Sequence, residues 1–161
     1  MKLKHTIPVV IAGLLVALGG LITDHSKLYP NTKLTPGAMA TQWTIQDICQ
    51  NGTGKYRKVP ESLKKEVAKE YGLTYPQPTG KIEIDHWYPL GIGGSNDIAN
   101  LWAMPAPQFH EKDVVEAYLN KQVCAQKMTV YDAQKIINNW YPFWQKNFKD
   151  KVGAVVEEPV E

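Results

Sequence analysis

Cysteine and histidine are scarce in this sequence. There are two cysteines, Cys49 and Cys124, and four histidines, of which only His86 and His110 lie in the central part of the chain. A structural zinc site takes four Cys or His ligands at short spacings, and these residues do not supply them. The sequence therefore excludes a domain of the zinc-finger type.

An excess of charge of one sign is also absent. The formal net charge is +2, and residues 23–161 contain 16 basic and 16 acidic residues. Overall charge therefore does not attract nucleic acid, and any binding surface has to come from local clustering. The most basic short stretch after the N-terminus is the loop 51–58, which includes Arg57. Residues 91–94 are rich in glycine, but no Gly-Lys-Ser/Thr follows them, which excludes a nucleotide-binding P-loop.

Long apolar runs are missing except at the N-terminus. Lys2 and Lys4 precede residues 7–22, which are 16 residues without a charge. A membrane-spanning helix needs about 20 residues, whereas the apolar core of a signal peptide is shorter. We expect residues 1–22 to be a signal peptide or, where it is not cleaved, an N-terminal signal anchor that attaches the protein to a membrane. Either reading predicts an exported protein that is secreted, periplasmic or held in the cell envelope.

The remaining chain has the length of one domain with tails. Residues 23–43 are rich in Thr, Pro, Asn and Gly and are predicted to be a linker. Residues 44–150 form the expected domain, and the acidic residues 151–161 are expected to be a disordered tail. We expect the protein to be a monomer.

Helical spacing of apolar residues predicts most of the secondary structure of this domain. The predicted helices cover Trp43–Cys49, Pro60–Tyr71, the residues after Pro107 to about Lys121, and a last helix from Thr129 to Trp140. Thr44 and Thr129 are the expected N-caps. Pro142 is expected to kink or end the last helix, and the aromatic residues around it are expected to lie in the core.

The two cysteines are predicted to form a disulfide. An exported chain folds in an oxidising compartment, where Cys49 and Cys124 would be joined. The closed loop would span 75 residues and contribute about 4 kcal/mol in the chain-entropy model.

The residues with catalytic potential are concentrated between Lys81 and Asp113. Alternation of apolar and polar residues predicts a strand that ends in Asp85-His86, and a glycine-rich turn follows it. A second extended run from Ala99 to Met104 carries Asn100. Pro105 and Pro107 then stop the strand and pre-set the first turn of a helix that carries His110. The predicted order is strand, turn, strand, helix, within an α+β fold.

This stretch resembles the HNH nuclease family, whose ββα-metal motif (the HNH or His-Me finger) has Asp-His, Gly-Gly, Asn-Leu and His in this order. The matching residues are Asp85-His86, Gly93-Gly94, Asn100-Leu101 and His110. One more residue separates Asn100 from His110 than the family pattern has. The resemblance extends over residues 35–141 to small exported bacterial HNH-like proteins, with the further motifs Thr35-Pro36-Gly37, Ile48-Cys49, Arg57, Tyr71-Gly72, Lys112-Asp113, Val123-Cys124 and Ala133-Gln134.

The resemblance implies a catalytic role for each residue of the motif. His86 would be the general base, because imidazole titrates nearest to physiological pH. Asn100 would accept the proton on one ring nitrogen of His86 and leave the other nitrogen free. Asp85 and His110, with Asp113 as a further candidate ligand, would hold one divalent cation, Mg²⁺ or Mn²⁺ before Zn²⁺ or Ni²⁺.

Substrate and alternatives follow from the same resemblance. Arg57 and Lys112 are the candidate substrate-binding residues, because a guanidinium or ammonium group pairs with phosphate. We expect a metal-dependent endonuclease that hydrolyses DNA, with RNA as the alternative, and with little sequence preference. The competing interpretation is a non-catalytic, exported binding protein that retains the ββα frame. A hydrolase of another envelope polymer lacks paired acids at a recognisable spacing.

Overall fold

The protein is represented by a computed structural model, in which residues 27–152 are described. The predicted signal segment 1–22 and most of the predicted tail lie outside these residues. The elements are α1 (Ile45–Asn51), the 3₁₀ helix η2 (Thr53–Lys55), α2 (Glu61–Glu70), β1 (Ile82–His86), the 3₁₀ helices η3 (Leu90–Ile92) and η4 (Ile98–Asn100), β2 (Leu101–Pro105), α3 (Gln108–Cys124), α4 (Val130–Ile137), α5 (Trp140–Asn147) and α6 (Lys149–Val152).

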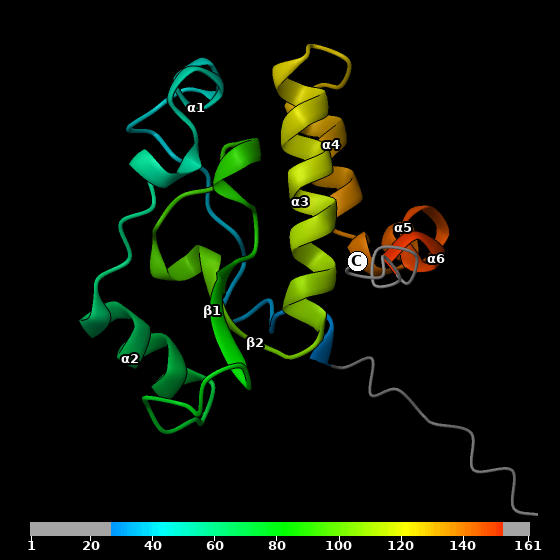
Figure 1. The fold of residues 1–161 in the computed structure, drawn as a ribbon. Helices are drawn as coiled ribbons and strands as arrows, with labels where there is room; N and C mark the ends of the chain where they lie inside the picture. The colour runs from blue at the N-terminus through cyan, green and yellow to red at the C-terminus, as the bar shows by residue number, and fades with distance from the viewer. Residues whose placement is uncertain (1–26, 153–161) are drawn as a thin grey trace, which may run out of the picture.

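The fold is α+β, as predicted, with one small antiparallel sheet among helices. Strands β1 and β2 pair in the register Ile82 to Pro105 and His86 to Leu101. Figure 1 shows this pair of strands between α2 and the long helix α3. The order of strand, loop, strand and helix predicted for residues 81–113 is confirmed.

Local sequence signals explain the helix boundaries. Thr44 caps α1 in a capping box with Asp47, and the Thr129 side chain accepts a hydrogen bond from the backbone N–H of Asp132 at the start of α4. Both predicted caps are therefore confirmed. The prediction that one helix runs from Thr129 to Trp140 is wrong, because α4 ends at Ile137. The expectation that Pro142 kinks or ends that helix is also wrong, because Pro142 lies in the first turn of the next helix, α5, where its missing N–H has no helical partner to lose.

The hydrophobic core lies between the sheet and the C-terminal helices. Its largest fully buried side chains are Trp102 of β2 and Trp140 of α5. The Trp140 indole N–H donates to the backbone oxygen of Leu28 at 2.9 Å, and Leu28 is itself buried. The aromatic residues near the C-terminus are therefore core residues, as the sequence predicts.

The predicted linker 23–43 is part of the domain from residue 28 onward. Thr35 is buried, and its hydroxyl donates to the backbone oxygen of Leu101 at 2.8 Å. Farther along, Met39 forms an isolated antiparallel bridge with Gly94. The sequence suggested a linker because its turn-forming residues have no helical or strand periodicity. Its backbone groups nevertheless pair with the loop between β1 and β2, and the Thr35 hydroxyl pairs with β2.

The predicted disulfide is confirmed. Cys49 of α1 and Cys124 at the end of α3 are joined, with their Cα atoms 5.4 Å apart. This bond ties the N-terminal helix to the far end of α3. Within residues 27–152 no helix combines the length and apolar character that a membrane span requires.

Candidate functional site

The loop between β1 and β2 is built around the side chain of Asn100. This amide is fully buried, and its Nδ2 donates to the backbone oxygens of Tyr88 and Ser95, both at 2.9 Å. Its Oδ1 accepts from the backbone N–H of Tyr88 at 2.9 Å and from that of Ala38 at 3.4 Å. Asn100 therefore satisfies backbone groups on both sides of the loop and fixes the loop's path.

Two glycines permit this path. Gly93 has φ +92, a left-handed conformation that side chains disfavour. A Cβ on Gly94 would lie 1.7 Å from the backbone oxygen of Tyr88, which is closer than any packing allows. The predicted glycine turn is therefore required for the backbone of the loop to close on itself.

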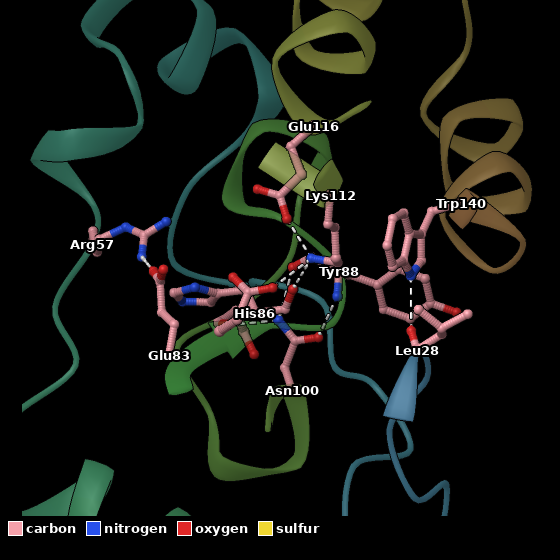
Figure 2. Close-up of polar contacts among 11 residues, drawn as sticks. Leu28, Arg57, Glu83, His86, Tyr88, Asn100, Lys112, Glu116 and Trp140 are labelled. Atoms are coloured by element: carbon pink, nitrogen blue, oxygen red, sulfur yellow. Dashed lines mark hydrogen bonds and ion pairs between the residues drawn. The ribbon is translucent and has the colours of Figure 1, made fainter. Parts of the chain in front are cut away.

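Lys112 lies at the centre of a buried ionic cluster where β1 meets α3. Its side chain has no exposed surface, and its Nζ lies 2.7 Å from Oδ2 of Asp85 and 2.8 Å from the backbone oxygen of His86. The third partner is Oε1 of Glu116, one turn farther along α3. The three N–H groups of the ammonium thus have three oxygen acceptors, as Figure 2 shows.

The charges in this cluster depend on one another. Burial lowers the pKa of Lys112, but the carboxylates of Asp85 and Glu116 outweigh it and raise that pKa above its ordinary value. Burial raises the pKa of Glu116, and the Lys112 charge offsets only part of that effect. Lys112 is therefore a permanent cation that compensates the Asp85 carboxylate inside the protein.

His86, the last residue of β1, is held by Asn96. The ring Nε2 lies 3.0 Å from Oδ1 of Asn96, whose Nδ2 donates to the backbone oxygen of Tyr56 at 2.8 Å. Asn96 Oδ1 also accepts from the backbone N–H of Lys58 at 3.4 Å. These backbone partners fix the orientation of the Asn96 amide, so the atom next to Nε2 is the oxygen. An oxygen can only accept, and Nε2 of His86 therefore carries the proton.

The other ring nitrogen of His86 is therefore a lone-pair acceptor. Nδ1 is buried and has no hydrogen-bond partner among residues 27–152. Burial lowers the pKa of His86 to about 4, against a smaller opposing effect of the Asn96 hydrogen bond. The imidazole is neutral at pH 7, and because His86 is only 1% exposed, the lone pair of Nδ1 does not face open solvent.

The Arg57–Glu83 ion pair lies beside the His86 ring, on the side away from Lys112 and Asn100 (Figure 2). Arg57 Nη1 and Glu83 Oε1 are 4.0 Å apart, and the two side chains are 48% and 40% exposed. Burial and the nearby charges of Asp85 and Asp113 raise the pKa of Glu83. At this distance and exposure the pair is weakly held, so both side chains are available to other partners.

Two clefts meet at Arg57. The larger, of about 470 Å³, lies between α2, residues 73–77 and β1, and Lys64 lines it together with Arg57. The smaller, of about 280 Å³, lies between Arg57, residues 89–91 and the face of α3 that carries Asp113 and Glu116. An extended ligand that occupied both clefts would therefore contact Arg57, next to the His86 ring.

His110 does not reach the cluster around Asp85. It is exposed in the first turn of α3 and contacts the ring of Phe109, with 4.1 Å between ring centroids. Helical residues four apart share a face, so the face that carries Lys112 and Glu116 lies against β1, and His110, two residues from Lys112, points away from it. The predicted contact of His110 with a site at Asp85 is absent, and Lys112 takes that position.

Three other predicted residues have different surroundings from those expected. Lys112 was a candidate substrate-binding residue, but it is fully buried and cannot contact a ligand in solution. Asn100 accepts from backbone N–H groups and not from His86, whose partner is Asn96. Asp113 lies at the surface of the smaller cleft, and partial burial together with the Asp85 charge raises its pKa.

Sequence reasoning missed Asn96, Glu83 and Glu116. Asn96 follows a run of glycines and serine, where asparagine is expected as a turn former. Glu116 stands four residues after Lys112, a spacing that predicts an ion pair on a helix, and this signal could have drawn attention to Lys112.

The predicted metal site does not fit these surroundings. Among residues 27–152 no three His, Cys, Asp or Glu side chains are grouped so that they could hold a metal ion. More directly, the proposed ligand Asp85 already has a cation at 2.7 Å, the Lys112 ammonium. A divalent ion bound to the same carboxylate would face the repulsion of that charge.

Comparison of this chain with protein-family models, with curated proteins and with solved structures gives no match.

Proposed function

We propose that this protein hydrolyses phosphodiester bonds of nucleic acid, with His86 as the general base. The observation that carries the proposal is the state of His86. Its Nε2–H is held by Asn96, its Nδ1 carries a free lone pair, and its pKa of about 4 keeps it neutral at pH 7. A base in this form accepts a proton without first having to lose one. The order of motifs that resembles the HNH family supports the same reaction.

Arg57 is the proposed phosphate-binding residue. It lies beside His86 and at the meeting point of two clefts, and its side chain is half exposed. Phosphate oxygens compete with Glu83 for the guanidinium, because an Arg–phosphate pair is bidentate and Glu83 is held only at 4.0 Å. Because His86 is buried, the proposed reaction also requires that this displacement of Arg57 expose the His86 ring to water.

In the proposed reaction, water attacks phosphorus while Nδ1 of His86 takes a proton from that water. A bond forms between phosphorus and the water oxygen, and the bond to the 3′ oxygen of the leaving strand breaks. The 3′ oxygen takes a proton from solvent, and Arg57 stabilises the charge on the non-bridging oxygens. The products are a 5′-phosphate and a 3′-hydroxyl.

The substrate is DNA, with RNA as the alternative. Arg57 is proposed to contact the phosphate backbone, and backbone contacts carry no sequence information, so cleavage is expected to show little sequence preference. The disulfide fits a protein that acts outside the cytoplasm.

Cleavage of supercoiled plasmid and of labelled DNA and RNA oligonucleotides tests the proposal. With the disulfide intact, the wild-type protein is expected to cut, His86→Ala to lose at least 100-fold in rate, and Arg57→Ala about 10-fold or more. Lys127→Ala is the matched control for Arg57, because it removes an exposed positive charge from the turn after α3.

His110→Ala tests whether His110 is the metal ligand that the sequence predicts or the exposed surface residue that the structure shows. A metal ligand would be essential, whereas the exposed position of His110 predicts nearly full activity. Equal activity of His86→Ala and wild type would refute the proposal. Binding of nucleic acid without cleavage would favour the non-catalytic binding protein.

A further inference from the structure

We infer that the Lys112 ammonium permanently takes the place of a divalent cation at Asp85, so that the chain has no metal site there and cleavage needs no metal. The catalytic half of this inference rests on the proposed function. The statement that no divalent cation binds at Asp85 depends on the ionic cluster alone.

The partners of Lys112 are those that a hard cation prefers. They are a carboxylate oxygen of Asp85 at 2.7 Å, the backbone oxygen of His86 at 2.8 Å and a carboxylate oxygen of Glu116. Mg²⁺ and Ca²⁺ are bound by carboxylate and carbonyl oxygens of this kind. An ammonium delivered by α3 therefore occupies an oxygen cage between the end of β1 and the helix.

Lys112 has no N–H group left that could donate to a substrate. All three N–H groups have acceptors, and the side chain is fully buried. Lys112 is therefore a positioning residue. By holding the Asp85 carboxylate and the His86 carbonyl, it fixes the end of β1 and thereby the direction of the His86 ring toward Asn96 and Arg57.

Removal of the ammonium would convert the cage into a metal site. Lys112→Met keeps an unbranched apolar stem but leaves the carboxylates of Asp85 and Glu116 facing the vacated position. Asp113, the next residue on α3, lines the same cleft as Glu116. A divalent cation is the natural partner for such a group of oxygens.

Binding of Mn²⁺, followed by the electron paramagnetic resonance signal of the free ion, tests the inference. Wild type and Asp85→Asn are expected to show the same weak binding at millimolar Mn²⁺, whereas Lys112→Met acquires a saturable site at least 10-fold tighter. A saturable wild-type site that Asp85→Asn abolishes would overturn the inference. If Lys112→Met does not fold, the comparison of wild type with Asp85→Asn decides alone.

Cleavage assays give the catalytic readout. Wild-type activity in excess EDTA is expected to stay within twofold of its value in Mg²⁺, whereas the activity of Lys112→Met is low in EDTA and rises at least 10-fold with Mn²⁺. Loss of wild-type activity in EDTA and its return with Mn²⁺ would contradict the inference. Absence of wild-type cleavage under every condition would refute the proposed function instead, and the Mn²⁺ binding result would still decide the role of Lys112.

Discussion

Exchange of Asn96 for aspartate is expected to move the titration of His86 toward neutral pH. The substitution places a carboxylate where Oδ1 of Asn96 now lies, 3.0 Å from Nε2 of His86. An opposite charge at such a distance stabilises imidazolium and raises a pKa by about 1–3 units. From a starting pKa of about 4, the pKa of His86 in Asn96→Asp is expected between about 5 and 7.

The same shift has a consequence for the rate. At pH 5 roughly nine tenths of the wild-type His86 is neutral, and with a pKa near 6 only about one tenth would be. Cleavage by Asn96→Asp at pH 5 is therefore expected to fall roughly tenfold relative to wild type, and to approach the wild-type rate at pH 8. NMR titration of the His86 ring measures the pKa directly, and the pH dependence of kcat/KM measures its effect.

Asn100→Asp is the informative comparison. It removes the Nδ2 donors from the buried backbone oxygens of Tyr88 and Ser95, at about 1–3 kcal/mol each, so urea unfolding is expected to show a loss of about 2–6 kcal/mol. The pKa of His86 is expected to stay near 4. Asn138→Asp, at an exposed asparagine after α4, controls for the added charge. A shifted His86 pKa in Asn100→Asp together with an unchanged one in Asn96→Asp would refute this assignment of the two asparagines.

Three further changes test what stabilises the fold. Replacement of Cys49 and Cys124 by serine is expected to lower the free energy of unfolding by about 4 kcal/mol in urea, and an unchanged value would contradict the entropic account of the crosslink. Gly94→Ala places a methyl group on the Tyr88 oxygen, so we expect a fall in Tm of several degrees, and a Tm equal to that of wild type would show that the loop opens freely. Burial raises the pKa of Glu116 in the folded state, so its ionisation destabilises the protein as pH rises above the ordinary carboxyl value. Glu116→Gln has no ionisable group at this position. The free energy of unfolding of Glu116→Gln minus that of wild type is therefore expected to increase from pH 6 to pH 8. A difference that does not vary with pH would contradict the effect of burial on Glu116.

Much of the frame could be predicted from the sequence because its signals are local. Alternation identified β1, Thr44 and Thr129 identified two helix starts, and Pro107 placed the start of α3. The pairing of the cysteines needed only their number and the expected oxidising compartment. Each of these inferences depends on neighbours in the chain and on no long-range geometry.

The contacts of the site could not be predicted in the same way. Which face of α3 lies against β1 depends on how the helix is rotated about its axis when it packs. Residues two apart lie on nearly opposite faces of a helix, so a different rotation would place His110 against β1 instead of Lys112. Asn96 and Asn100 stand four residues apart around a loop that reverses direction. The path of this loop brings the Asn96 amide to His86 and the Asn100 amide to the backbone groups of the loop. Gly93 and Gly94 make that path possible.

The proposed reaction depends most directly on the tautomer and pKa of His86, and ¹⁵N NMR of the imidazole in the full chain measures both. We predict that at pH 7 Nε2 is protonated, Nδ1 is not, and the ring becomes charged only near pH 4. A proton on Nδ1 at pH 7, or titration at the ordinary histidine value near 6.5, would contradict it.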